Sequence, residues 1–260
     1  YHMKKIFLMA AFATVHCLNA QFKISIEAPT NFEAKEVDIY TLNGSKDILY
    51  SKVNRQGNFW QLNVDQPYSG MMKAYFPEVN ATINFISENK EVKLKLETDN
   101  RQVKNIIYLD ESNNLMNNLQ QKKEYILPAL YQIKEYYKSK SEFGDALNGE
   151  IDRLSQPAQN LSKHPFISFY NINYGRFIEK NASKKPITHQ EISDFLVSAP
   201  PLLETSSLLR PLLITYLNIG PSTNVNEDVD KLLKEVNINS TRGQNVLAEF
   251  IEIFDMYDMA

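Results

Sequence analysis

Cysteine is nearly absent from this chain of 260 residues, which contains only Cys17. This cysteine lies in the opening stretch MKKIFLMAAFATVHCLNAQFKI, residues 3–24. If the stretch is removed from the mature protein, no disulfide, no nucleophilic thiolate and no cysteine ligand for a metal remains. The fate of Cys17 therefore decides which sulfur chemistry is open to the chain.

The opening stretch has the order of a secretory signal peptide. Met3 is followed by Lys4 and Lys5, and the run from Ile6 to Val15 is apolar apart from one threonine. This run is about half the ~20 residues that a membrane-spanning helix needs. We therefore expect a cleaved leader that exports the protein to the periplasm, and no permanent membrane span.

Cleavage after Ala20 would remove Cys17 together with residues 1–20, in which Tyr1-His2 is read as a cloning remnant. The alternative fate is a lipid anchor on Cys17. A lipoprotein signal has small residues before the cysteine, whereas a valine and a histidine precede it here. We therefore expect a discarded cysteine and not a lipoprotein.

An excess of basic residues is also missing. The 31 acidic residues outnumber the 28 lysines and arginines, so the net charge is −3, and loss of Lys4 and Lys5 with the leader would make it −5. Nucleic-acid binding requires a basic face, so we exclude nucleic acid as a partner. The eight glycines are scattered, and neither a glycine-rich phosphate loop nor a GxSxG nucleophile segment is present.

Histidine is scarce as well, and only His164 and His189 would remain after cleavage. They are far apart and in no HExxH spacing, so we expect no zinc site. We expect a solvated His189 in the first turn of a helix and a His164 that serves the start of another. The acid pairs at 110–111 and 227–228 stand where helices should begin, which the helix dipole favours. We predict no catalytic, metal-binding or cofactor-binding residue and no cofactor.

What the chain does contain is a change of hydrophobic period near residue 110. Residues 21–110 alternate between apolar and polar, as in FKISIEA (22–28) and EVKLKLET (91–98). The pair Asn43-Gly44 predicts a tight type I′ hairpin. Seven or eight short strands with turns at close spacing predict an antiparallel β-sandwich or barrel.

Residues 111–260 follow a helical period instead, so the predicted fold class is α+β, with an all-α helical domain after the antiparallel β domain. The segment 112–140 is helical but divided by Pro128, THQE (188–191) has the pattern of a capping box, and Pro211 should bend its helix. One apolar set fits either an intramolecular core or a dimer seam, and its members are Leu127, Leu130, Ile133 and Tyr137.

Aromatic residues of the β half are the candidate ligand-facing side chains. Trp60, Tyr68 and Tyr75 could form a platform on which a sugar stacks. The alternative is that they belong to the core of the sheet, where aromatic residues on alternating strand positions are common.

The order of these features resembles a known protein group. The leader ending in NAQ, the β module opening with FKISIEA, the run ESNNLMNNLQQKKEYILPALYQIKEYY and the helix start HPFISFYN are similar to one family. These are the N-terminal regions of periplasmic thioredoxin-like thiol–disulfide oxidoreductases of Bacteroidetes-type bacteria. The resemblance implies a C-terminal thioredoxin-like domain with a Cys-x-x-Cys pair, which this sequence does not contain. No redox residue can therefore be carried over.

The last apolar period runs to Ala260 with no glycine, proline or basic last turn, which favours a chain cut before a further domain over a frayed terminal helix. Our first hypothesis is an accessory region that positions or dimerises the redox domain, or recruits its envelope protein substrates. The second is a stand-alone envelope module that binds a peptide or glycan. A third is an enzyme that uses two carboxylates in one cleft.

Overall fold

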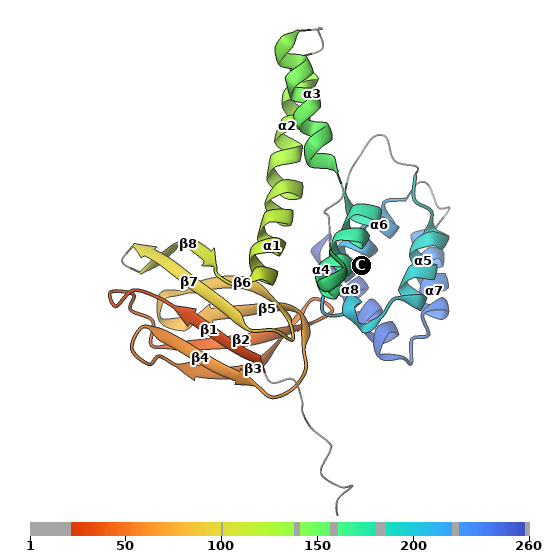
Figure 1. The fold of residues 1–260 in the computed structure, drawn as a ribbon. Helices are drawn as coiled ribbons and strands as arrows, with labels where there is room; N and C mark the ends of the chain where they lie inside the picture. Colours follow the sequence, from red (N-terminus) through yellow and green to blue (C-terminus); the bar gives the residue numbers. More distant parts are fainter. Residues whose placement is uncertain are drawn as a thin grey trace, which may run out of the picture.

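The computed structural model describes residues 22–99, 101–137, 141–156, 161–179, 186–219 and 224–257. The predicted leader, its cleavage site after Ala20 and Cys17 lie outside these residues. The strands and helices follow the predicted order, with the β half first and the helices after it (Figure 1). None of the helices in the described ranges is long and apolar enough to cross a membrane.

The described part of the β half forms two four-stranded sheets, in the orders β4-β1-β7-β8 and β3-β2-β5-β6. The sheets stay separate, so the fold is an unclosed sandwich and not a barrel. All pairs are antiparallel except β1 with β7. The strands are β1 Phe22–Glu27, β2 Glu36–Asn43, β3 Lys46–Asn54, β4 Phe59–Val64, β5 Ser69–Phe76, β6 Ala81–Glu88, β7 Val92–Asp99 and β8 Gln102–Tyr108.

The hairpin between β2 and β3 differs from its prediction by one residue. Asn43 pairs with Lys46, so the two-residue loop is Gly44-Ser45. Gly44 has a φ of +69°, and Ser45 is not among the residues with positive φ. A positive φ at only the first loop position is the pattern of a type II′ turn, and a type I′ turn needs it at both. The Asn-Gly pair therefore marks the hairpin correctly but not its turn type.

Three short 3₁₀ turns are present among the described residues, namely η1 Pro77–Val79 in the β half and η3 Leu161–Lys163 and η5 Pro201–Leu203 in the helical half. The helical half also contains ten longer helical elements. The helical elements of the described residues are α1 Glu111–Gln120, η2 Gln121–Ile126, α2 Leu127–Tyr136, α3 Glu142–Ser155, α4 Pro165–Asn173, η4 Tyr174–Ile178, α5 His189–Ser198, α6 Leu209–Leu217, α7 Val225–Glu235 and α8 Thr241–Met256. Both η2 and η4 are π-helical. The predicted capping box between Thr188 and Glu191 is present at the start of α5.

The two prolines do not act as predicted. Pro128 does not divide its segment, because α1, η2 and α2 run on without a break and the residues at both junctions keep right-handed helical φ and ψ. The π-helical η2 ends just before Pro128, where a wider turn can accommodate a residue that has no N–H. Pro211 lies in the first turn of α6, which begins at Leu209. A first-turn N–H has no partner within the helix, so Pro211 bends nothing.

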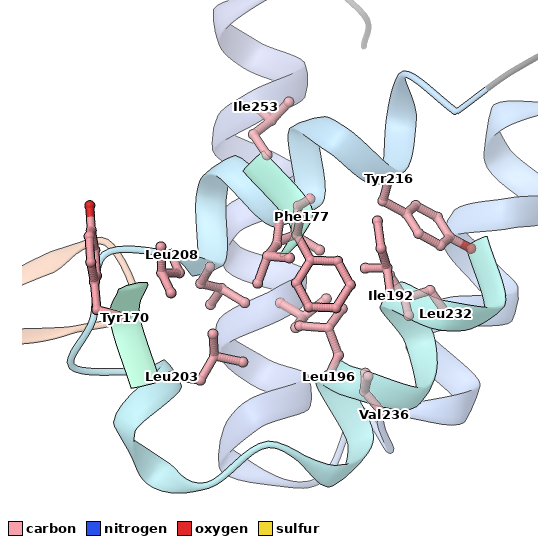
Figure 2. Packing of buried hydrophobic residues seen from close by; sticks show 14 of the residues in the cluster. Tyr170, Phe177, Ile192, Leu196, Leu203, Leu208, Tyr216, Leu232, Val236 and Ile253 are labelled. Atoms are coloured by element: carbon pink, nitrogen blue, oxygen red, sulfur yellow. The ribbon is translucent and has the colours of Figure 1, made fainter. Parts of the chain in front are cut away.

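A projecting arm is the most distinctive feature of the helical half. It consists of η2, α2 and α3, and Figure 1 shows it extending away from both the sandwich and the other helices. Its base is α1, which contacts β6 and β8 of the sandwich. The remaining helices pack around a second apolar core, part of which is drawn in Figure 2.

The sandwich and the helical core touch each other directly. Ile86 of β6 belongs to the helical core cluster. The backbone N–H of Gly44 donates to the carbonyl of Glu204 at 2.7 Å, and that of Met71 donates to the carbonyl of Thr205 at 2.8 Å. Backbone hydrogen bonds of this kind fix the position of the 204–205 segment against the ends of β2 and β5.

Candidate functional site

The three aromatic residues predicted to face a ligand do not share an exposed surface. Trp60 is 1% exposed and packs edge-on against Phe32 and Phe76, with centroid distances of 6.2 and 5.0 Å. Its indole N–H donates to a backbone carbonyl at 3.3 Å. Trp60 thus fills the sandwich core and has no free ring face for a sugar.

Tyr68 and Tyr75 lie elsewhere. The Tyr68 hydroxyl donates to the carbonyl of Met71 at 2.6 Å and accepts from the N–H of Leu42 at 3.0 Å, and burial raises its pKa to about 12. Tyr68 therefore holds two backbone segments together. The Tyr75 hydroxyl contacts Asn80 Oδ1 at 3.2 Å on the surface.

The two histidines have structural partners. The prediction of a solvated His189 is wrong. This residue is half-buried, and its ring lies 4.5 Å from that of Tyr216. Its Nε2 is 3.0 Å from the Tyr216 carbonyl. The tertiary contact between α5 and α6 thus overrides the local expectation of a first-turn position in solvent. His164 does stand directly before α4, at its N-cap position.

His164 belongs to a buried cluster with Ser112 and Glu88. Its Nδ1 lies 2.7 Å from Glu88 Oε2 and 3.4 Å from Ser112 Oγ. The composition is that of a catalytic triad, but the geometry is not, because a triad histidine uses one ring nitrogen for the acid and the other for the nucleophile. All three residues are also buried, at 8% exposure or less.

The role of this cluster is visible in the contacts of Glu88. Its Oε1 accepts from the backbone N–H groups of Phe166 and Ile167 at 3.0 and 3.2 Å. These N–H groups belong to the first turn of α4, which has no partner for them within the helix. A carboxylate from β6 thus caps α4, and the cluster joins the sandwich to the helices.

The acid pairs have the structural role predicted for them. Asp110 is the N-cap of α1, where it accepts from the N–H of Asn113, and Glu227 and Asp228 lie in the first turn of α7. Within the described ranges, no group of three or more histidine, cysteine, aspartate or glutamate side chains could hold a metal ion.

A groove of about 820 Å³ separates the arm from the body of the helical half. Glu124, Leu127 and Tyr131 line it from the arm, and Tyr174 and Ile178 line it from η4. Both π-helical segments thus contribute to one surface. π-helical turns occur frequently at functional sites, since the extra residue widens the helix and changes the direction of its side chains.

The polar groups of this groove are mainly acceptors. Glu124, Glu135 and Glu179 lie along it with one cation, Lys123. The Lys123 ammonium donates to the carbonyl of Asn171 at 3.2 Å, lies 3.9 Å from Glu179 and stands 5.6 Å above the ring of Tyr174. Burial raises the pKa of the Glu124 carboxyl. The enzyme that uses two carboxylates in one cleft stays a prediction.

A second surface lies on α2 and η2, away from the groove. Tyr125, Ile126, Ile133 and Tyr136 are 63%, 44%, 38% and 80% exposed. None of the four lines the groove. Consecutive members are one, seven and three positions apart, which at about 100° per residue places all four on one side of a helix. We call these four residues the arm stripe.

The apolar set that fitted either a core or a dimer seam is divided between the two. Leu127 is buried and Leu130 half-buried, whereas Ile133 is exposed and belongs to the arm stripe. Tyr137 is 52% exposed and meets Phe143 of α3, with ring centroids 4.8 Å apart. The groove could not be predicted from the sequence. The segments that form its two walls are about fifty positions apart, and no local pattern predicts that they meet.

No protein-family model matches the chain, and no curated protein matches it. The arguments for function therefore rest on the residues and geometry given above.

Proposed function

We propose that this chain is an accessory region of a periplasmic thiol–disulfide oxidoreductase and that its role is association with a second copy through the arm. The sandwich and the packed helices form the base from which the arm projects (Figure 1). The redox pair would belong to a thioredoxin-like domain outside this sequence, as the resemblance implies.

The observation that carries the association role is the exposure of the arm stripe. The most exposed of its residues, Tyr136 and Tyr125, are large aromatic side chains. Tyrosine is enriched at protein interfaces because one side chain combines a large apolar area with a hydroxyl group. An exposed apolar surface of this kind marks an interaction site more often than a solvated face.

Charge favours a second copy as the partner. Residues 121–136 carry three lysines and two glutamates, whereas residues 142–155 carry four acidic residues and one arginine. In an antiparallel pair of arms, the more basic segment 121–136 of one copy would lie against the acidic segment 142–155 of the other. A two-fold axis makes this contact twice, since the same patch is used on both copies. Opposite charges in register favour the pairing and orient it.

Sedimentation velocity on the purified chain tests this association. We expect a dimer whose population rises with protein concentration, and a monomer for Ile133→Asp and for Tyr136→Asp. The matched control is Ile251→Asp, which changes an isoleucine that is 60% exposed on α8. A wild-type chain that stays monomeric at all concentrations would refute the association role.

The redox assignment has a separate test. Reading the native gene beyond the codon for Ala260 should reveal a Cys-x-x-Cys pair in a thioredoxin-like sequence. A stop codon at this point, with no such pair downstream, would refute the assignment and leave the arm surface unaffected.

A second candidate function is peptide binding at the edge of the β3-β2-β5-β6 sheet. Within the described residues β3 pairs only with β2, and Ile48, Leu49 and Tyr50 on it are 47%, 48% and 36% exposed. An open edge strand can accept a peptide as an additional strand. A peptide array probed with the chain tests this function, and Leu49→Pro should abolish any binding, because proline blocks the ladder.

A further inference from the structure

We propose that the groove between the arm and η4 binds a peptide segment of another protein in which lysine or arginine residues stand beside apolar ones. This site is distinct from the arm stripe, since the two surfaces share no residue. The proposal goes beyond self-association and does not depend on it.

The floor of the groove is suited to apolar side chains. Leu127, Tyr131, Tyr174 and Ile178 all line it. The two tyrosine rings come from opposite walls, one from α2 and the other from η4. Grooves that combine apolar residues with a few polar groups on the rim are the usual form of a peptide-binding surface.

The charge of the groove favours a cationic occupant. Glu124, Glu135 and Glu179 outnumber Lys123 among the charged lining residues. Lys123 is itself engaged, because it contacts both Glu179 and the Asn171 carbonyl. An incoming lysine or arginine would therefore meet Glu124 and Glu135 on the α2 side. Glu124 is exposed at the rim, but neighbouring atoms desolvate its carboxyl enough to raise its pKa, and a cation beside it would offset that partial loss of solvation.

The geometry of the two walls supports a built site. Without the π-helical turns in η2 and η4, the residues after each turn would be rotated by one position about the helix axis. Leu127, Tyr131 and Glu135 follow η2, and Glu179 follows η4. The same two irregular turns therefore present the charged and aromatic groups on which the proposal rests.

Fluorescence anisotropy with labelled peptides tests the proposal. The probe is the amphipathic peptide LKKLLKLLKKLL, and its partner LEELLELLEELL has the same apolar residues with the opposite charge. We expect the purified chain to bind the lysine peptide and not the glutamate peptide. The double variant Glu124→Gln/Glu135→Gln should weaken binding on the order of tenfold, because it removes two charge pairs at the rim.

The matched control is Asp145→Asn/Asp152→Asn, which removes two exposed carboxylates from α3 of the same arm. Binding by this control should stay within about twofold of wild type. An equal loss in both double variants would overturn the proposal in favour of diffuse charge attraction. Displacement of the peptide by an equal concentration of spermidine would overturn it in favour of a small polyamine, and no binding of the lysine peptide would overturn it outright.

Two further measurements separate this proposal from the proposed function. Tyr174→Ala should weaken peptide binding without changing the sedimentation behaviour. Tyr136→Asp should abolish self-association and still bind the lysine peptide in preference to the glutamate peptide. If Tyr136→Asp abolished peptide binding as well, the groove would not be a separate site and the proposal would fail.

Discussion

Replacement of Glu88 should weaken the attachment of the helices to the sandwich. The Glu88 side chain is 1% exposed and accepts from four groups. Two of these are the N–H groups that open α4, and the others are the Ser112 hydroxyl at 3.0 Å and the His164 ring at 2.7 Å. Glu88→Ala leaves all four without their acceptor in a site that water does not reach.

The expected loss of stability follows from this arrangement. Removing one partner from a buried charged network costs about 3–5 kcal/mol, because the remaining polar groups stay desolvated. For a chain of this size, each kcal/mol lowers Tm by roughly 2–4 °C. Glu88→Ala should therefore lower Tm by about 10 °C. Glu88→Gln keeps an oxygen for the two N–H groups but places an amide nitrogen, which cannot accept, toward Ser112 and His164, so its loss should be about 1.5–3 kcal/mol.

Urea denaturation followed by circular dichroism measures both losses. Glu91→Ala is the matched control, since Glu91 lies three positions away on the surface and pairs only with the exposed Lys93. Its effect should stay within about 0.5 kcal/mol. A loss below about 1 kcal/mol for Glu88→Ala would refute the argument that this carboxylate caps α4.

Three other regions give predictions of their own. Gly243→Ala should destabilise the protein strongly, because a Cβ at this position would overlap the backbone of Asn237. Gly149→Ala on the arm should instead stabilise α3 by about 0.5–1 kcal/mol, because its Cβ would meet nothing within 4 Å. Thermal unfolding of the two variants measures both effects. Arg242→Lys should lower Tm, since it replaces a guanidinium fork that binds a glutamate and three backbone carbonyls. Trp60 emission should be blue-shifted and resist acrylamide until the sandwich unfolds, because the ring is 1% exposed.

The strands of this fold were readable from the sequence because their signal is local. FKISIE of β1 is buried at every second residue, as its alternation predicts. The parallel pairing of β1 with β7 was not readable, because it joins segments about seventy positions apart. The position of Trp60 was left open for a similar reason, since alternation does not say which face of a strand is covered by a second sheet.

The helical half shows where local rules stop. Pro128 and Pro211 both lack a backbone N–H, but whether this breaks or bends the helix depends on the structure around each proline. At Pro128 a π-helical turn removes the conflict, and at Pro211 the helix start does so. The candidate groove depends on the meeting of η2 and η4, so it could be found only in the folded protein. Which members of the apolar set Leu127, Leu130, Ile133 and Tyr137 are exposed could also be learned only from the folded protein.

The arm explains why both proposed surfaces lie on α2. A helix of ten residues is marginal in water without tertiary contacts, and α2 buries only Leu127. Its order therefore depends on α3 and on continuity with α1 through η2. A partner that covers either face of α2 also stabilises the helix that forms the other face. If both proposals hold, linkage requires that a ligand in the groove and a second copy on the arm stripe strengthen each other's binding by the same factor.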